Sequence, residues 1–421
     1  MIDTSSAAIA PQVALGCATS PPAQEPPDAA TCAALLREAA TAGNAVVPWG
    51  GGTQQQLGAP PARCDLLLST RRLSGVDFYR PEDLTIGVRA GTTLAEVASL
   101  LAAHGQSLPL DAPCPEAATI GGIVATATSP VRRYRYGTVR DLVIGVEVAL
   151  VDGSLCKAGG RVVKNVAGYD LCKLFAGSLG TLGVIVGVNL KVQPRPRVEA
   201  TVHVAFERED AALAAGRAVT QSGLGHGAVL VEGQPGKASW TLTVLAEGFS
   251  GAVDRQVEVA ERAASAAHSK AILHPGAESS QAAVNALAAR RSLQPDQGTV
   301  LVRGSVAPAH LATVLQQLPP VLEPSYRVTY VQADVPLGIF FLELDPGTET
   351  SDLACAAVLR QARSVVQHES GHLVLEAGPT SLRRTLDPWG APPDGEGLAR
   401  LIKRKLDPAG ILNPGRFAYG I

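Results

Sequence analysis

Two neighbouring stretches decide the fold of this chain: KNVAGYD at residues 164–170 and GSLGTLGVI at residues 177–185. The second stretch is rich in glycine and small hydroxylated residues, so its backbone can come close to a bulky group. Residues 184–188 are largely apolar and predict a strand that leaves this loop. A glycine-rich turn that feeds a strand is one way to bring backbone N–H groups to a phosphate or an extended cofactor. In the first stretch, Lys164 and Asn165 are candidate donors to such a cofactor, although Lys164 is also consistent with a surface lysine.

A second glycine loop follows a short predicted strand at residues 45–49. Its sequence is Pro48-Trp49-Gly50-Gly51-Gly52-Thr53-Gln54. Three consecutive glycines expose several N–H donors with no side chain in the way, which suits a pyrophosphate. A lone glycine triplet is more often a flexible turn, and this one fits neither the P-loop nor the spaced dinucleotide fingerprint. The glycine triplet therefore indicates a cofactor site only together with the other loops.

A third loop of this kind reads Ala118-Thr119-Ile120-Gly121-Gly122 and continues through small residues to Thr126. It again allows close approach of the backbone. Shortly after it, residues 132–137 place three arginines in four positions. Such a cluster is either solvated surface or a site for a phosphate, a carboxylate substrate or an acidic partner, and the sequence does not decide between them.

Composition limits the class of protein. The 421 residues are 46% hydrophobic and 18% charged, which fits a folded protein of two or three domains. A net charge of −2 and an aromatic share of 4% argue against nucleic acid as a partner, and no apolar run is long enough to span a bilayer. Seven cysteines without a C-x-x-C pair argue for a reducing cytoplasm and against zinc or an iron–sulfur cluster in this chain.

The chain divides into four predicted parts. Residues 1–27 are rich in Ala, Pro and Ser and are expected to form a loose leader. Residues 28–195 contain the three loops, a helix over 29–42, and a hairpin whose turn is Asp152-Gly153. In residues 196–395 strand-like runs alternate with Ala-rich helical stretches, which predicts a helix-backed antiparallel sheet. Residues 396–421 form a C-terminal tail, with a helix that ends near residues 407–410.

The loops together resemble a known family. Residues 50–53, 118–122, 136–141, 164–185 and 406–416 occur in the order and spacing of vanillyl-alcohol-oxidase-type FAD flavoproteins, also called PCMH-type. Within that superfamily the chain looks most like the smaller FAD-binding subunit of bacterial glycolate oxidase. The resemblance implies an α+β fold, with a two-subdomain FAD-binding domain followed by a C-terminal α+β domain.

The resemblance also implies roles for individual residues. The first glycine loop and the Thr-Ile-Gly-Gly segment would hold the FAD pyrophosphate, and residues 180–185 would line the adenine and ribityl path. The cofactor-binding residues expected in this way are Pro48, Trp49, Gly50, Gly51, Gly52, Thr53, Gln54, Ala118, Thr119, Ile120, Gly121, Gly122, Thr126, Lys164, Asn165, Gly180, Thr181, Gly183, Val184 and Ile185. Tyr169, Leu171, Leu174 and Phe175 are expected to pack a short helix instead.

Two departures from the family pattern change these expectations. Thr53 and Gln54 stand where many relatives have a histidine that bonds covalently to the flavin, so we expect non-covalent FAD. The His-rich metal motif of catalytic hydroxy-acid dehydrogenases is missing from residues 196–395, so no catalytic residue is predicted.

The resemblance further implies a glycolate oxidase complex with a larger FAD subunit and an iron–sulfur subunit, oxidising glycolate to glyoxylate. Such a complex would be cytoplasmic, attached to the inner membrane at most through partner subunits. The alternative is a stand-alone FAD oxidoreductase for another 2-hydroxy acid or alcohol, and a scaffold that has lost its flavin is a third reading.

A remote alternative is a zinc peptidase, because residues 368–372 read H-E-S-G-H. That chemistry needs both histidines on one helix. Gly371 interrupts the motif and residues 372–376 predict a strand, so a helix ending near Gln367 is the plainer interpretation.

Overall fold

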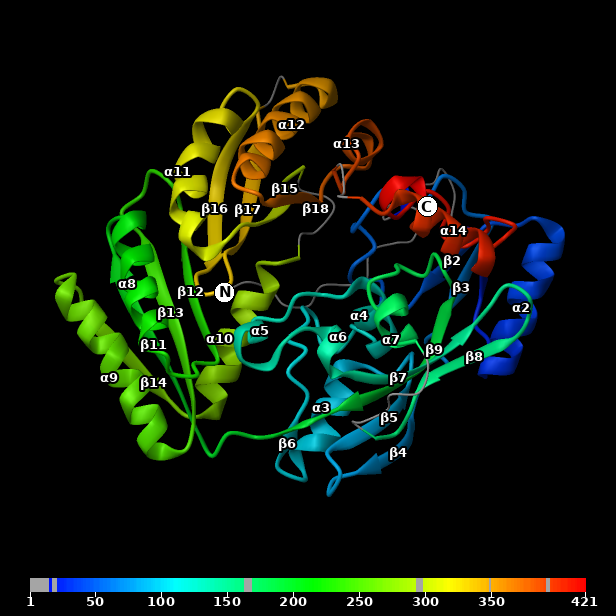
Figure 1. The fold of residues 1–421 in the computed structure, drawn as a ribbon, viewed down its shortest axis with the longest axis horizontal. Helices are drawn as coiled ribbons and strands as arrows, with labels where there is room; N and C mark the ends of the chain where they lie inside the picture. The colour runs from blue at the N-terminus through cyan, green and yellow to red at the C-terminus, as the bar shows by residue number, and fades with distance from the viewer. Residues whose placement is uncertain (1–14, 17–20, 163–168, 293–297, 348–349, 391–393) are drawn as a thin grey trace. The chain divides into compact units, whose positions relative to one another are not determined.

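The computed structural model describes residues 15–16, 21–162, 169–292, 298–347, 350–390 and 394–421. The chain forms two compact units (Figure 1). The first unit contains residues 1–130, 137–195 and 391–421, and the second contains 131–136 and 196–390. Among the described residues, no helix has the length and apolar character needed to cross a membrane.

The first unit begins with a small parallel sheet covered by a helix. The order of its strands is β1 (Ala23–Gln24), β3 (Leu66–Ser69), β2 (Val46–Trp49). Helix α2 (Ala29–Ala42) has the predicted bounds, because Asp28 caps its first turn and Gly43 ends it at a φ of 71°. Cys32 and Leu36 of α2 pack against the sheet.

A five-stranded antiparallel sheet forms the rest of the first unit. Its order is β4 (Val76–Arg80), β5 (Thr85–Arg89), β9 (Val184–Lys191), β7 (Val143–Ala149), β8 (Leu155–Gly159). The predicted Asp-Gly hairpin joins β7 to β8, with Gly153 at a φ of 85°. Helices α3 (Leu94–Ala102) and α4 (Ile120–Thr126) contribute apolar residues to the core on this sheet. Side chains alternate along β9, so Val184 faces the core under α2 while Ile185 faces the core under α3 and α4.

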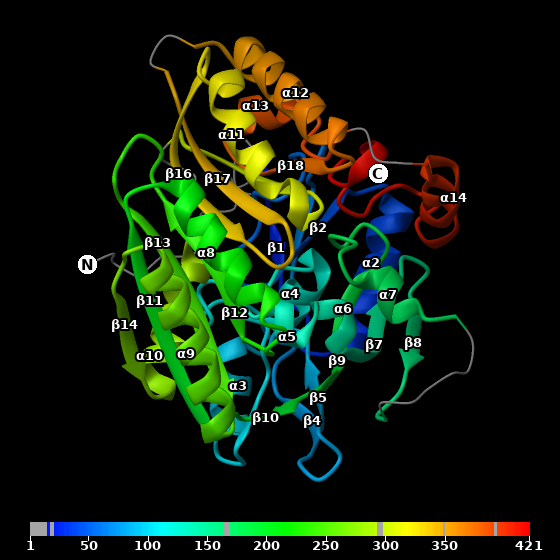
Figure 2. The same cartoon turned by 60° about the vertical axis from the view of Figure 1, so that its left-hand side comes forward.

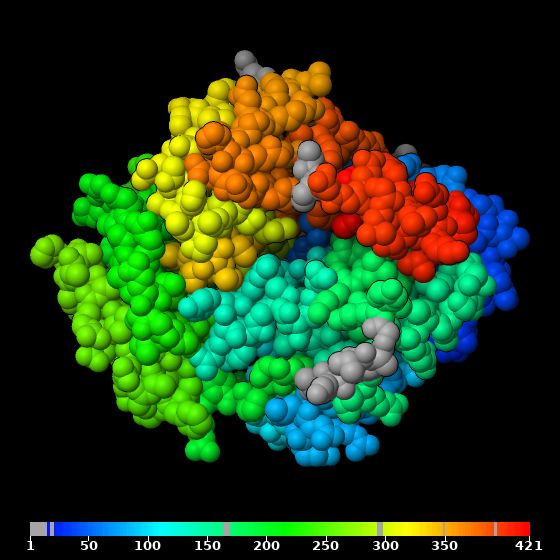
Figure 3. Space-filling view, in the orientation of Figure 1, coloured from blue at the N-terminus to red at the C-terminus, as the bar shows by residue number. Residues whose placement is uncertain are grey.

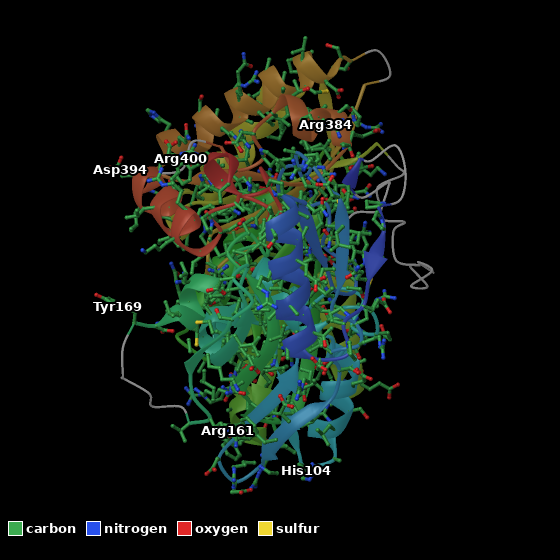
Figure 4. All side chains as sticks on the ribbon, turned by 90° about the vertical axis from the view of Figure 1, so that its right-hand side faces the viewer. His104, Arg161, Tyr169, Arg384, Asp394 and Arg400 are labelled. Carbon is green, nitrogen blue, oxygen red and sulfur yellow. The ribbon has the colours of Figure 1, made fainter. Side chains whose placement is uncertain are left out.

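The remaining elements of the first unit are short or lie near its chain ends. They are β6 (Gln106–Ser107), α6 (Val139–Leu142), α7 (Leu171–Phe175), β10 (Gln193–Pro194), α14 (Glu396–Leu406) and η3 (Ala418–Gly420). Phe175 of α7 is buried as expected, but Tyr169 is 94% exposed and points away from the ribbon (Figure 4). The packing expected for Tyr169 is therefore wrong, because Asp170 caps α7 and Tyr169 lies outside the helix.

The second unit is built on one eight-stranded sheet (Figures 1 and 2). Its order is β14 (Ala271–Pro275), β11 (Val198–Phe206), β13 (Trp240–Gly248), β12 (Ala228–Gly233), β16 (Tyr326–Asp334), β17 (Ile339–Pro346), β15 (Val300–Ser305), β18 (His372–Ala377). Neighbouring strands all pair antiparallel. This is the helix-backed antiparallel sheet that the strand–helix alternation predicts.

Helices cover the two faces of this sheet unequally. One face packs on α8 (Glu209–Gln221), α9 (Ser250–Ala266), α11 (Leu311–Leu322) and α12 (Asp352–His368), which share the main core (Figure 2). The other face carries α10 (Ala277–Ala289) and Val131, which precedes α5 (Arg133–Tyr136). The short elements η2 (Pro308–His310) and α13 (Thr380–Thr385) complete the unit.

Part of the expected leader is ordered. Residues 23–24 form β1, and the N–H of Leu67 donates to the carbonyl of Pro22 over 2.8 Å. Leu15 is buried beside Val47 and Trp49. A loose leader over all of 1–27 is therefore wrong for residues 21–27, because β3 offers them a free edge to pair with.

Candidate functional site

The first unit contains a cleft walled by all three predicted loops. It encloses about 670 Å³, part of which is open to solvent. Its lining residues are Pro48, Gly50, Gly51, Gly52, Thr53, Gln54, Gln55, Thr70, Thr119, Gly121, Gly122, Ala125, Thr126, Leu179, Gly180, Val184, Ile185, Asn413 and Arg416. The three glycine loops, far apart in sequence, thus meet at one place.

The loop after β2 supplies hydrogen-bond donors. Within the described part of the chain, the N–H groups of residues 50–54 have no hydrogen-bond acceptor. Glycine is required here by packing as well, since a Cβ on Gly50 would lie 2.3 Å from Thr119 Oγ1 and one on Gly51 would lie 1.8 Å from the carbonyl oxygen of Ala117. Five uncommitted donors on a loop locked against its neighbour suit an anionic group.

The loop that opens α4 contributes shape rather than donors. The N–H of Ile120 donates to Thr92, that of Gly121 to Ala90, and that of Gly122 to the capping hydroxyl of Thr119. A Cβ on Gly121 would lie 2.6 Å from the Cβ of Ala90, so only glycine lets α4 come this close to the strand end. The side of α4 that faces the cleft is formed by small residues, including Ala125 and Thr126.

The third wall is the loop before β9. Leu179 and Gly180 both adopt positive φ, 53° and 69°, and the N–H of Leu179 donates to Ala125 over 2.8 Å. Gly180 packs against the ring of Pro48, where a Cβ would lie 2.9 Å from Cγ. The loop therefore closes onto both other walls through backbone contacts.

Most of the predicted residues line the cleft. Trp49, Ala118, Ile120, Thr181 and Gly183 lie behind the walls and are not among its lining residues. Thr181, for example, turns inward, because its hydroxyl donates to the carbonyl of Ser178 over 2.7 Å. Lys164 and Asn165 lie outside the described residues.

Two lining residues come from the C-terminal tail and were not predicted as site residues. Asn413 Nδ2 donates to the carbonyl of Leu179 over 2.6 Å, while its Oδ1 has no partner among the described residues and its side chain is 2% exposed. Arg416 donates to Leu57 and, through two nitrogens, to the side chain and carbonyl of Gln55. The sequence did contain a signal for these two residues, because residues 406–416 belong to the family pattern described above.

A buried ion pair holds this tail in place. Lys403 Nζ lies 2.6 Å from Asp407 Oδ2 and also donates to the carbonyls of Thr181 and Leu412. Asp407 in turn accepts from the N–H groups of Ile411 and Leu412. Burial lowers the pKa of Lys403, and the hydrogen bond and charge of Asp407 act in the opposite direction. The pair joins α14, the loop before β9 and the tail strand beside β2.

Comparisons with known proteins agree with this geometry. A model of the FAD binding domain family matches residues 24–159. Over nearly the whole chain (94%), the fold is like that of a solved alkyldihydroxyacetonephosphate synthase, with a TM-score of 0.71, 17% identity and 77% of that chain covered. Residues 24–159 thus form an FAD-binding domain, most of which lies in the first unit.

Curated relatives make the resemblance more specific. The chain is 40% identical over 145 residues to glycolate oxidase subunit GlcE of Escherichia coli, and 35% identical over 167 residues to subunit GlcD of Bacillus subtilis. These matches cover 34% and 40% of this chain. They span only 41% and 36% of the two relatives. The protein is similar to glycolate oxidase subunits.

FAD fits the residues present. The loop of residues 50–54 offers free N–H groups for a pyrophosphate, and Asn413 offers an unpaired amide oxygen. Gly50, Gly51 and Gly180 let the walls pack closely on one another, because a Cβ at each would clash with a neighbouring residue of the protein. Neither Thr53 nor Gln54 can form the histidyl bond of covalently flavinylated relatives.

The arginine cluster and the H-E-x-x-H motif lie in the second unit, outside this cleft. Arg132 is 9% exposed, Arg135 donates to the carbonyl of Gly225, and Tyr136 donates to Glu247 over 3.1 Å. Burial raises the pKa of Glu247, while Arg132 and Arg135 act against that rise. Arg132 is buried whereas Arg135 is exposed, so only part of the cluster is solvated surface, and Arg135 and Tyr136 contact the buried carboxyl group of Glu247.

The zinc-peptidase alternative fails on geometry. Helix α12 ends at His368, Ser370 adopts a φ of 55°, and His372 begins β18. The two imidazoles therefore do not share one helical face. Glu369 instead pairs with His310, which ties the end of α12 to η2.

Proposed function

We propose that this protein is the FAD-binding subunit of an oxidoreductase complex that oxidises a 2-hydroxy acid, with glycolate as the first candidate substrate. The observation that carries the proposal is the cleft of the first unit, whose uncommitted N–H donors and glycine walls suit FAD. Glycolate is the first candidate because of the 40% identity to glycolate oxidase subunit GlcE. These matches span under half of the relatives' lengths, so the activity and the substrate of this protein are proposals.

In this proposal each wall of the cleft has a separate task. The N–H groups of residues 50–54 bind the pyrophosphate, and Gly121 and Gly122 let the backbone come close to it. Gly180, Val184 and Ile185 line the adenine and ribityl path. Asn413 adds a side-chain contact from the tail, and Arg416 holds the first glycine loop through Gln55. When bound, FAD supplies a two-electron acceptor for the hydride of the hydroxy-acid Cα.

Partners complete the proposed activity. Oxidation of glycolate to glyoxylate releases two electrons and two protons, and the proton of the hydroxyl needs a base. Residues 196–395 lack the metal motif of catalytic hydroxy-acid dehydrogenases. A larger FAD subunit and an iron–sulfur subunit are therefore the proposed companions, in a cytoplasmic complex with any membrane attachment made by those partners.

A stand-alone oxidoreductase for another 2-hydroxy acid is the second candidate. It rests on identities of 34% to a D-lactate dehydrogenase of Archaeoglobus fulgidus and 37% to the bovine mitochondrial D-2-hydroxyglutarate dehydrogenase. These two matches cover about as much of this chain as the matches to the glycolate oxidase subunits do.

Purification from the native cell separates the two candidates. The proposal expects a yellow protein with two co-purifying subunits, and reduction of an artificial electron acceptor with glycolate in preference to D-lactate and D-2-hydroxyglutarate. Acid precipitation should release all flavin into the supernatant, since attachment is non-covalent. A lone protein active on D-lactate favours the second candidate, and a protein without flavin refutes both.

A further inference from the structure

Helix α14 presents two leucines to solvent. Leu398 is 64% exposed and Leu401 is 55% exposed. They are three residues apart and so lie on the same side of the helix. Ile402 and Leu406, on the adjacent side of α14, pack on the core of the first unit. Figure 3 shows α14 in red at the surface of the molecule.

Cations flank the leucine pair. Arg404 and Lys405 lie three and four residues after Leu401, are exposed, and form no ion pair within the described residues. Arg400 is committed to Glu396 and to the carbonyl of Tyr419. Within α14 the acidic residue is Glu396 in the first turn, and Asp407, just after the helix, is buried and paired with Lys403. Asp394, before the helix, points into open space in Figure 4. The exposed C-terminal end of α14 is therefore positively charged, although the net charge of the whole chain is −2.

Stabilisation of helix α14 itself explains only part of this arrangement of leucines and cations. Cations in a last helical turn interact favourably with the helix dipole, which accounts for Arg404 and Lys405. It does not account for two large leucines on the same exposed side. An apolar centre with a charged rim is the usual anatomy of a protein–protein interface.

We propose that the outer face of α14, defined by Leu398, Leu401, Arg404 and Lys405, docks a partner subunit through an apolar recess rimmed by acidic side chains. The cationic rim selects an acidic partner surface. Two leucines are too few for stable membrane anchoring, which takes more than one signal. The curated relatives are named as subunits, so a partner chain is expected. The inference rests on the complex put forward under "Proposed function".

Helix α14 is also connected to the cofactor cleft. The same helix holds Lys403, which bonds to the carbonyls of Thr181 and Leu412. Their neighbours Gly180 and Asn413 line the cleft. The proposed docking helix is thus bonded directly to the residues next to two walls of the cleft.

The test compares three proteins: wild type, the double variant Leu398→Glu/Leu401→Glu, and the control Leu353→Glu. Leu353 is 71% exposed at the start of α12 in the second unit, so the control adds a charge at an equally open leucine. Each chain is purified with its co-expressed partner subunits, which are identified by mass spectrometry. Flavin content and the affinity between subunits are then measured.

The proposal expects partner affinity to fall at least about tenfold in the double variant, as for truncation of an interface hot spot, and to stay unchanged in the control. Isolated double variant should keep its flavin, which shows that it has folded. Arg404→Glu/Lys405→Glu should slow association and weaken its salt dependence.

Three results would each overturn the docking proposal without refuting the proposed complex. If the double variant keeps its partners at wild-type affinity, the surface lies elsewhere. If it converts a wild-type homodimer to a monomer, the occupant is a second copy. If it loses binding to anionic liposomes but not to the partners, the occupant is a membrane. A wild-type chain that carries flavin but has no partners refutes the complex itself.

Discussion

Replacing Gly51 with alanine tests the central claim about the cleft. A Cβ there would lie 1.8 Å from the carbonyl oxygen of Ala117 and 2.7 Å from its carbon, both backbone atoms that cannot rotate away. Real Cβ contacts do not fall below 3.0 Å, so the loop must move by at least 1.2 Å, the difference between 3.0 and 1.8 Å. Such a movement takes donors beyond hydrogen-bonding distance of a fixed phosphate.

The expected loss follows from the donors displaced. A hydrogen bond to a charged group contributes about 1.5–3 kcal/mol, so losing two of them costs at least about 3 kcal/mol, or more than about a hundredfold in the dissociation constant of FAD. Flavin fluorescence titration of the apoprotein measures it. Gly251→Ala is the matched control, because its Cβ would meet nothing within 4 Å. Folded Gly51→Ala protein that binds FAD as tightly as wild type would refute this account of the loop.

Three further variants probe the tail and the second unit. Arg416→Ala removes three hydrogen bonds to Gln55 and Leu57 and should weaken FAD binding by about 10- to 100-fold, with Arg416→Lys only partly restoring it. Lys403→Met leaves Asp407 buried without its cation and should destabilise the first unit by about 3–5 kcal/mol in denaturant unfolding; a change under about 1 kcal/mol would contradict the role of this pair. Asp334→Asn should stabilise the second unit at pH 8 and have little effect near pH 4, as followed by thermal melts. Burial raises the pKa of Asp334 to about 7 against the opposing charges of Arg291 and Arg133, so the stability associated with its protonated form is lost as pH rises through that value; equal melting temperatures at pH 8 would show that the carboxylate is tolerated.

The helix predicted over residues 29–42 has the observed bounds of α2, because the residues that end a helix act over a few residues only. The structure shows the same kind of local signal at α3, where Thr93 and Glu96 form a capping box. The three glycine loops were recognisable for the same reason. Which members of each loop face the cleft was not, since Thr181 turns inward while Leu179 lines the wall.

Long-range packing accounts for what the sequence did not predict. Segment 131–136 belongs to the second unit because Glu247, far along the chain, is buried and draws Arg135 and Tyr136 to it. No local pattern marks such a partner. Likewise β1 forms only because β3 leaves an edge free, and nothing in the composition of residues 21–27 indicates it.

The cleft extends beyond the segment of the chain that the family match covers. The family match ends at residue 159, yet a wall of the cleft is formed by residues 179–185 and another contact surface by Asn413 and Arg416. Arg416 fixes Gln55, and Asn413 fixes Leu179, so the tail bonds to two of the three glycine loops. Since Lys403 of α14 bonds to the tail, the cleft depends on residues 394–421 as directly as on the glycine triplet. The cleft is thus defined by these contacts, while the larger part of the second unit, residues 196–390, is inserted in the chain between β10 and α14.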